Sequence, residues 1–287
     1  MGRRPPTVHG MVLIDKPAGM TSHDVVAQLR KRFKERRIGH AGTLDPDATG
    51  LLVVGVGNAT RLLRFATSSF KTYEVEIVLG IETDTLDSSG QVVAEHQMLV
   101  EAAQVTEAAR ALTGEIEQIP PMVSARRVGG RRLHELAREG KEVEREARSV
   151  TIRKFDVQAT NDPLIWSAVV NCSAGTYIRT LGADLGTALQ GGAHIRNLRR
   201  IQSGVFGIQE SDVILEAPLQ PVLELVRGLD RVALTDQEIP VVRNGGRLSH
   251  ERTEGAGPWA LTDSSENLIA VHEKIDDRVV VGVVLPN

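Results

Sequence analysis

Cysteine and long apolar runs are scarce in this chain, and each scarcity excludes a class of protein. The sequence of 287 residues has a single cysteine, Cys172. It can therefore form no internal disulfide and no cysteine-based zinc cluster, which favours a reducing, cytoplasmic setting. No apolar run approaches the roughly 20 residues that a membrane-spanning helix needs. The basic N-terminus also lacks the apolar segment of a secretory signal. These absences predict a cytoplasmic globular protein.

The net charge is slightly negative, but the basic residues are unevenly distributed. The formal charge is -3 at pH 7, and 41% of the residues are hydrophobic, as in a globular protein with a sizeable core. Lysine and arginine nevertheless concentrate in three stretches, residues 1–40, 126–141 and 196–200. Such stretches can bind a phosphate backbone even in an acidic chain, although each can also be an ordinary solvated surface. Nucleic acid is therefore a candidate partner.

The apolar pattern predicts a mixed fold of helices and strands. The expected strands span residues 9–15, 51–56, 71–79, 149–158 and 164–172, of which the last two are adjacent and antiparallel. The expected helices begin at Thr21 or Ser22, at Asn58, near Val105, at Thr176 and near Leu219. Three further strands, at 259–262, 268–272 and 279–285, predict a small β module that follows a main body of residues 1–234.

The stretch GHAGTLDPDATGLLVVGVGNATR, residues 39–61, is the strongest local candidate for a functional site. Asp45 precedes Pro46, whose ring pushes the residue before it toward an extended conformation. Glycines nearby permit close backbone approach. A stiff carboxylate beside the buried strand at 51–56 could be a catalytic group, although Asp-Pro-Asp is also ordinary turn chemistry.

Aromatic residues make up only 3% of the chain, and its two tyrosines both lie at junctions between elements. Tyr73 opens a strand, and Tyr177 lies in the turn GTYIR. This placement suggests stacking on a flat base, although buried structural tyrosines would fit equally well. Arg179 could pair with Asp45 and keep its carboxylate ionised.

Other chemistries have weaker support. Glu82, Asp84 and Asp87 could suggest a metal site, but they lack EF-hand spacing and turns are rich in aspartate. Cys172 lies in an apolar strand and is expected to be inert, and Ser173 lacks a nucleophile-elbow context. We therefore expect no metal and no cofactor.

Five motifs in order resemble the TruB-type tRNA pseudouridine synthases, which isomerise the T-loop uridine at tRNA position 55. They are VLIDKPAGMTSHDVV, GHAGTLDPDATGLLVVGVGNATR, KTYEV, GTYIRTLGADLG and GAHIRNLRRIQSG. The resemblance covers almost the whole chain. It implies the α/β (α+β) pseudouridine synthase fold, a mixed, largely antiparallel sheet flanked by helices and loops. It also implies a catalytic domain at 1–234 with a basic RNA-binding insertion at about 121–147, and a β-rich PUA-like domain at 235–287.

The resemblance also implies roles for particular residues. Asp45 matches the essential nucleophile, Tyr73 the ring that stacks on the target base and is implicated in proton removal, and Arg179 the partner of the aspartate. Five further positions match residues that bind the substrate or support the site. They are His40, in the space of the flipped nucleotides; Tyr177, lining the pocket; Leu198, an apolar contact to the base; Asp87, a polar contact to the base; and Lys16, which with Pro17 supports the catalytic loop.

The predicted function is therefore isomerisation of a tRNA uridine by base flipping, without a cofactor. Asp45 could attack either the uracil ring or the ribose anomeric carbon. The expected partner is the T-arm stem-loop of tRNA, and a monomer is expected. Two alternatives remain open at this point. One is a non-catalytic RNA-binding or tRNA-folding factor, which the basic stretches would also serve, and the other is an aspartate-based nucleosidase that releases free uracil.

Overall fold

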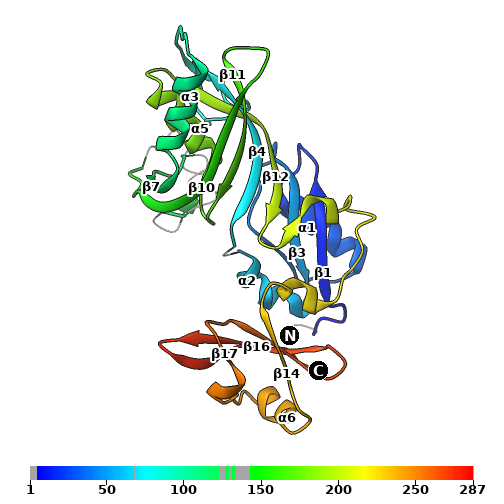
Figure 1. The fold of residues 1–287 in the computed structure, drawn as a ribbon. Helices are drawn as coiled ribbons and strands as arrows, with labels where there is room; N and C mark the ends of the chain where they lie inside the picture. The colour runs from blue at the N-terminus through cyan, green and yellow to red at the C-terminus, as the bar shows by residue number, and fades with distance from the viewer. Residues whose placement is uncertain (1–4, 68, 123–126, 129–130, 133–142, 287) are drawn as a thin grey trace. The chain divides into compact units, whose positions relative to one another are not determined.

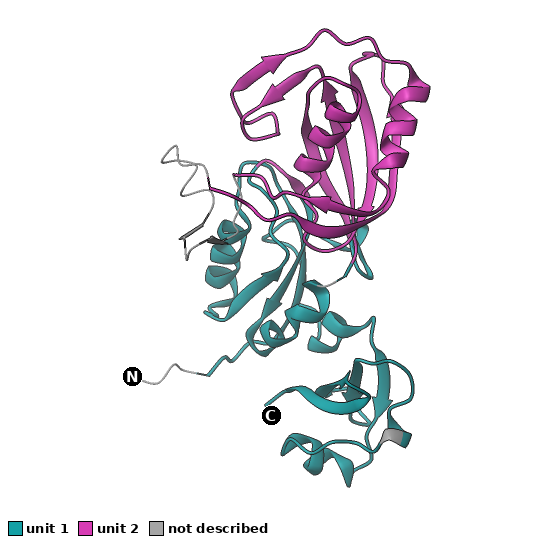
Figure 2. Cartoon of the chain, turned by 90° about the vertical axis from the view of Figure 1, so that its left-hand side faces the viewer, with its two compact units in different colours: residues 1–46, 50–69, 203–287 teal, residues 47–49, 70–202 magenta. Residues whose placement is uncertain are grey.

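The computed structural model describes residues 5–67, 69–122, 127–128, 131–132 and 143–286. The chain divides into two compact units (Figure 2). Unit 1 comprises residues 1–46, 50–69 and 203–287, and unit 2 comprises residues 47–49 and 70–202. Among the described residues, no helix is long and apolar enough to cross a membrane.

Unit 1 is built on buried strands that share one partner (Figure 1). Strands β1 (Gly10–Lys16) and β2 (Ile38–Ala41) both pair antiparallel with β3 (Thr49–Val56). Residues along β1 and β3 are buried almost without interruption, which explains why their sequences are continuous apolar runs rather than alternating ones. The strands expected at 9–15 and 51–56 are confirmed, whereas β2 was not expected.

Helix α1 (Ser22–Phe33) begins at the expected cap. Thr21 and Asp24 form a capping box, in which the Asp24 backbone N–H donates to Thr21 Oγ1 at 3.1 Å and the Thr21 N–H donates to the Asp24 carboxylate at 2.9 Å. The helix buries Val25, Val26 and Leu29 against β1 and β3. Its first turn is therefore held in place beside the chain that leads out of β1.

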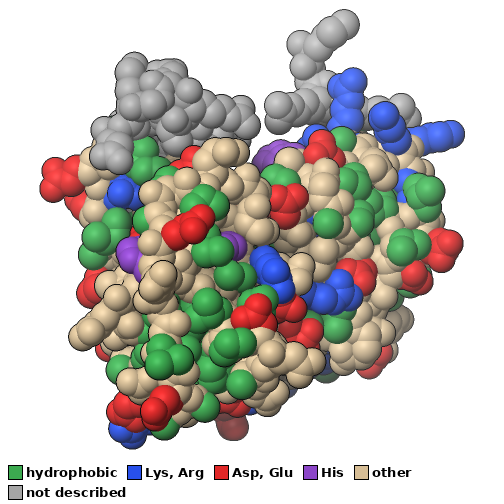
Figure 3. All heavy atoms as spheres, turned by 90° about the horizontal axis from the view of Figure 1, so that it is seen from above, with side chains coloured by type: hydrophobic (Ala, Val, Ile, Leu, Met, Phe, Trp, Pro, Cys, Tyr) green, Lys and Arg blue, Asp and Glu red, His purple; other side chains and the backbone are tan. Residues whose placement is uncertain are grey.

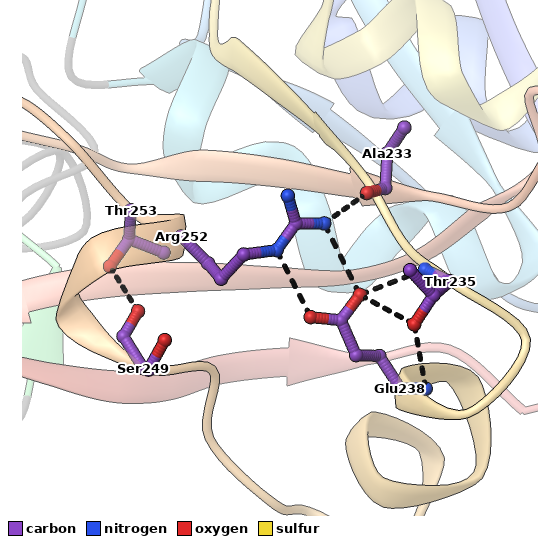
Figure 4. A network of polar contacts seen from close by, with 6 residues as sticks. All are labelled: Ala233, Thr235, Glu238, Ser249, Arg252 and Thr253. Carbon is purple, nitrogen blue, oxygen red and sulfur yellow. Dashed lines mark hydrogen bonds and ion pairs between the residues drawn. The ribbon is translucent and has the colours of Figure 1, made fainter.

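The C-terminal part of unit 1 has a four-stranded sheet with the order β14-β15-β16-β17. These strands are Asp230–Ala233, Trp259–Thr262, Leu268–Ile275 and Arg278–Val284. The three strands expected in this tail are confirmed, and β14 joins their sheet from before residue 235. Figure 4 shows hydrogen bonds that link the segments between these strands. Arg252 donates to the Glu238 carboxylate at 3.0 Å and to the Ala233 carbonyl at 2.6 Å. Glu238 also accepts from the Thr235 backbone at 2.8 Å.

Unit 2 contains a sheet with the strand order β12-β4-β11-β10-β7. The strands are β4 (Lys71–Leu79), β7 (Gly114–Gln118), β10 (Arg148–Ala159), β11 (Ile165–Cys172) and β12 (Ala193–Ser203). Helices α3 (Ala102–Ala111) and α5 (Ile178–Ala188) pack on one face of it around a shared apolar core (Figure 1). The strands expected at 71–79, 149–158 and 164–172 are confirmed, as is the antiparallel pairing of the last two.

The remaining elements are short and lie in connections. In unit 1 they are η1 (Gly57–Leu62), α2 (Leu63–Thr67), β13 (Phe206–Gly207), η2 (Ile208–Glu210), η3 (Val222–Val226), α6 (Glu238–Arg243) and η4 (His250–Arg252). In unit 2 they are β5 (Ile81–Thr83), β6 (Val92–Glu95), β8 (Arg127–Val128) and β9 (Arg131–Arg132). Most of the insertion expected at 121–147 lies outside the described residues.

Two expected helix caps are wrong. The segment after β3 starts as a 3-10 helix with Val56 at its N-cap, and Asn58 instead accepts a hydrogen bond from Arg37 at 3.4 Å. Helix α5 has Tyr177 at its N-cap, while the Thr176 hydroxyl donates to the Ser173 carbonyl at 3.0 Å. The Thr176 hydroxyl is engaged within the preceding turn, and Asn58 is engaged by an arginine from the segment before β2. These hydrogen bonds outweigh the capping preference of the two side chains.

We predict that Thr21→Ala lowers the free energy of unfolding by about 1 kcal/mol, because it removes the side-chain acceptor at the α1 N-terminus. Urea unfolding followed by circular dichroism measures this. Thr106→Ala in α3 is the matched control, since that hydroxyl only bonds the Ala102 carbonyl one turn back and its loss should be close to neutral. Equal losses in both variants would contradict a capping role for Thr21.

Candidate active site

Asp45 lies in the loop between β2 and β3, and the residue before it is held by a serine. Leu44 is 3% exposed. Its backbone N–H donates to Ser22 Oγ at 2.9 Å, and the Ser22 hydroxyl donates back to the Leu44 carbonyl at 3.2 Å. The side chain of Asp45 itself is half-buried. One buried hydroxyl at the start of α1 therefore satisfies both backbone groups that precede the carboxylate.

The residue after Asp45 is held by a buried lysine. Lys16, at the end of β1, is 0% exposed. Its ammonium donates to the carbonyl oxygens of Pro17 at 2.8 Å, Met20 at 2.7 Å and Pro46 at 3.0 Å. A lysine has three N–H donors, so these carbonyls provide one acceptor for each. Lys16 thereby fastens the Asp45 loop to β1 and to the turn that follows it.

His40 lies on β2, opposite Val54 of β3. Its half-buried ring meets the ring of His23 from α1 edge to face, with centroids 5.7 Å apart and an interplanar angle of 84°. The contact positions the imidazole between β2 and α1. No strand was expected at His40, so its position on β2 is a correction, and its expected place among flipped nucleotides stays a prediction.

In unit 2, Arg179 lies in the first turn of α5 and is 4% exposed. Its Nε lies 3.6 Å from Asp87 Oδ2, and its Nη1 donates to the Thr85 carbonyl at 3.0 Å. Asp87 Oδ1 also accepts from the Thr85 hydroxyl at 2.7 Å and the Ser89 backbone at 3.1 Å. The ion pair between Arg179 and Asp87 was not expected. The pairing of Arg179 with Asp45 joins the two units and stays a prediction.

The loop that carries Asp87 is bonded to β12. The Ser88 N–H donates to the Ile195 carbonyl at 2.9 Å, and the Ile195 N–H donates to the Leu86 carbonyl at 3.1 Å. Leu198 follows on the same strand, and both it and Tyr73 of β4 pack half-buried against the core under α5. Unit 2 therefore places Tyr73 and Leu198 on neighbouring strands against one core, and it pairs Arg179 with Asp87.

Tyr177 is placed by a residue that the sequence did not single out. The side chain of Gln118, at the end of β7 and 1% exposed, accepts from the Tyr177 N–H at 3.0 Å and donates to the Tyr177 carbonyl at 3.3 Å. This pair of hydrogen bonds ties the start of α5 to the edge of the sheet. A glutamine at a strand end has no local signature, so only the burial of its amide reveals the role.

The acidic residues considered for a metal site are engaged separately. Glu82 pairs with His96 at 2.6 Å, Asp84 accepts from the Gln91 N–H at 2.9 Å, and Asp87 is bonded as described above. Within the described ranges, no three His, Cys, Asp or Glu side chains converge as metal ligands would. Cys172 is 1% exposed, and burial raises the pKa of its thiol to about 11, as suits an unreactive cysteine.

Comparison with solved structures identifies the class of fold. It resembles a chain in a structure titled "Crystal Structure of a Cbf5-Nop10-Gar1 Complex", with a TM-score of 0.74 and 23% identity over 96% of this chain and 84% of that one. It also resembles a chain in "Structure of H/ACA RNP bound to a substrate RNA containing 2'-deoxyuridine", with a TM-score of 0.69, 22% identity and coverage of 96% and 84%. The architecture is the pseudouridine synthase fold.

Sequence comparison identifies the family. The model "TruB family pseudouridylate synthase (N terminal domain)" matches residues 30–178, and "tRNA pseudouridylate synthase B C-terminal domain" matches residues 179–234. A protein of Streptococcus sanguinis (strain SK36) named tRNA pseudouridine synthase B is 42% identical, over 94% of this chain and 97% of its own length. A protein of the same name from Mycobacteroides abscessus is 40% identical, over 96% of each. The chain belongs to the TruB family of pseudouridylate synthases.

We predict that Lys16→Met lowers the free energy of unfolding by about 2–4 kcal/mol, because buried carbonyls lose their charged donor. Activity should fall as well, since Pro46 and with it Asp45 lose one attachment to β1. Urea unfolding and a turnover assay measure the two effects. Lys31→Met, on the exposed side of α1, is the control and should change stability by less than about 0.5 kcal/mol. Wild-type stability in Lys16→Met would contradict this role.

Proposed function

We propose that this protein converts the T-loop uridine at position 55 of tRNA to pseudouridine. Family membership supplies the reaction class, and the names of the relatives support tRNA as the substrate. The observation that carries the proposal is how the chain around Asp45 is held. Leu44 before it and Pro46 after it are each hydrogen-bonded to a buried side chain. A carboxylate held in this way is preorganised to attack a substrate carbon.

The reaction breaks the bond between N1 of uracil and C1′ of the ribose and forms a bond from C5 to C1′. Asp45 is the proposed nucleophile, and it attacks either C1′ or C6 of the ring. The base detaches, rotates and rejoins through C5, and the bond to Asp45 breaks. The proton on C5 then leaves, and N1, which has lost its bond to C1′, gains a proton. No external reactant enters, so the protein must supply a nucleophile, a shaped pocket and a path for that proton.

The target uridine must leave the folded T-loop before Asp45 can reach it. Flipping a base costs a few kcal/mol, which stacking and pocket contacts offset. We assign Tyr73 to stack on the flipped uracil and Leu198 to contact it, because they lie on the neighbouring strands β4 and β12 and pack half-buried against one core. His40 is assigned to the space that the flipped nucleotides leave.

Polar contacts complete the proposed site. A guanidinium has five donors, so Arg179 can hold the Asp45 carboxylate in its ionised form while it retains Asp87 and Thr85. Asp87 is assigned a polar contact to the base, Tyr177 a place in the pocket wall, and Lys16 the support of the catalytic loop. These roles rest on the match to the family motifs and on the contacts of each residue within its own unit.

The proposed partner is the T-arm stem-loop, bound by a monomeric, cytoplasmic protein. Acidic and basic side chains are interspersed on the face seen in Figure 3, and the net charge of the chain is -3. We therefore assign RNA binding to local basic stretches such as residues 126–141. The family match ends at residue 234. Three strands of the C-terminal sheet and most of one apolar core lie in the tail, which supports a PUA-like module at 235–287.

We predict that Asp45→Asn lowers tritium release from T-loop RNA labelled at uridine C5 by more than about 10³-fold, as loss of a nucleophile does. RNA affinity should change less than about threefold, since amide and carboxylate have the same shape. Asp47→Asn, exposed and two residues along the loop, is the control and should keep its activity. Full turnover in Asp45→Asn would leave the RNA-binding factor as the better description.

The products of the same reaction distinguish the proposed isomerase from the nucleosidase alternative. Chromatography of the products should show pseudouridine within intact RNA. Free uracil as the main product would instead mean that Asp45 cleaves the glycosidic bond without the base rejoining.

We predict that tRNA affinity falls steeply with salt concentration, because lysine and arginine side chains that bind phosphates release counterions. Replacing Arg131 and Arg132 by Gln should reduce the slope of log K against log salt by about one for each phosphate that is no longer neutralised. Arg110→Gln is the control, since that exposed guanidinium is paired with Glu107 at 2.8 Å. An unchanged slope would show that residues 126–132 do not take part in the RNA interface.

A further inference from the structure

Helix α5 begins without a cap from its own side chains. Its N-cap residue is Tyr177, and in the described structure the Tyr177 side chain makes no capping hydrogen bond. The Thr176 hydroxyl donates instead to the Ser173 carbonyl at 3.0 Å. The first N–H groups of a helix have no partner within it, so their partners come from elsewhere. The start of α5 therefore depends on contacts from outside the helix.

Gln118 supplies such a contact from the end of β7, 59 residues earlier in the chain. Its Oε1 accepts from the Tyr177 N–H at 3.0 Å, and its Nε2 donates to the Tyr177 carbonyl at 3.3 Å. The same carbonyl accepts from the Leu181 N–H at 3.0 Å, one turn into the helix. A carboxamide offers an acceptor and a donor side by side. One side chain therefore bonds both backbone groups of the N-cap residue.

Gln118 is itself held in place by the chain around it. It lies opposite Arg148 in the antiparallel pairing of β7 with β10. Two residues further along, the Pro120 carbonyl accepts from Arg145 Nη1 at 2.9 Å. Gln118 is 1% exposed, so its amide is covered by protein and does not reach a ligand on the surface. It is a fixed, buried point to which the start of α5 is bonded.

The rest of α5 is held by other contacts. Gly182 approaches β12 so closely that a Cβ at this position would lie 2.4 Å from Ile195 Cγ2. Leu181 and Leu185 belong to the buried core of unit 2. Removal of the Gln118 amide should therefore leave the helix packed on the sheet and loosen its first turn.

The first turn of α5 carries Arg179, which pairs with Asp87 and donates to the Thr85 carbonyl. We propose that Gln118 is a positioning residue of the reaction, which directs the Arg179 side chain by capping α5 from the sheet. The inference rests on the proposed function, in which Arg179 keeps the Asp45 carboxylate ionised. Gln118 itself touches neither the substrate nor the reacting atoms. A displacement of about 1 Å in a group that orients a reactant can slow a reaction by about a hundredfold.

Single-turnover tritium release with enzyme in excess, measured between pH 5 and pH 9, tests the proposal. Gln118→Met keeps the length of the side chain but removes its donor and acceptor, and it should lower the rate constant at pH 7 by about tenfold or more. RNA affinity should change less than about threefold, because the side chain is buried. Circular dichroism establishes that the variant is folded in the assay. A wild-type rate constant in Gln118→Met would overturn the proposal.

Gln118→Glu gives a readout that a loss of stability alone would not produce. Its carboxylate has no proton to donate to the Tyr177 carbonyl. Once protonated, the carboxyl group donates to that carbonyl through its O–H and accepts from the Tyr177 N–H through its other oxygen, as the amide does. Burial raises the pKa of such a carboxyl group, so the rate constant relative to the wild type should rise as the pH falls. A ratio that stays constant from pH 9 to pH 5 would overturn the proposal.

A double-mutant cycle tests whether the effect of Gln118 passes through Arg179. Arg179→Lys keeps the positive charge but loses the planar fork of donors, and it should retain part of the turnover. Since Gln118 is proposed to direct the guanidinium, Gln118→Met should slow Arg179→Lys by a clearly smaller factor than it slows the wild type. Equal factors in both backgrounds would mean that the two residues act independently, which would overturn the proposal.

The controls separate this inference from the proposed function. Gln158 is an exposed glutamine of β10, and Gln158→Met and Gln158→Glu should match the wild type at every pH. If the wild type is active and Asp45→Asn is not, the proposed function stands whatever the Gln118 variants do. A wild type that releases no tritium would overturn the proposed function, and this inference with it.

Discussion

The placement of Asp45 depends on how the protein satisfies one buried ammonium. Lys16 is fully buried, so its three donors must all find acceptors inside the fold. They find carbonyl oxygens in the turn after β1 and in the Asp45 loop. The lysine is therefore accommodated only when that loop is closed over it. The same contacts that stabilise the unit consequently orient the carboxylate, and Ser22 repeats the arrangement on the other side of Asp45.

Unit 2 follows the same principle with a buried guanidinium. Arg179 is buried against Asp87 and a backbone carbonyl, and the Asp87 loop is in turn bonded to β12. Buried cations are costly unless a negative group offsets them. The Asp87 carboxylate offsets the charge of Arg179.

The elements that the sequence predicted well are those whose pattern is local. The strand at 71–79 alternates and ends on Gly80, where the backbone turns with a φ of 84°. Thr21 and Asp24 stand at capping-box spacing, and α1 starts there. Asn58 and Thr176 have the same local preference but bond elsewhere, because a nearby arginine and a preceding carbonyl compete for them. Strand β2 was missed, since four residues with two small side chains have no clear period.

By itself the sequence determined the element types, the absence of a disulfide and, through five ordered motifs, the family and the residues to consider. Those properties depend on neighbours along the chain. Only the tertiary structure decided that Lys16 bonds Pro46, that Arg179 pairs with Asp87, and that Gln118 holds Tyr177. These partners lie far apart along the chain, and they pair because a polar group taken out of water needs a partner inside the fold. A local sequence pattern cannot predict which distant segments are buried against each other.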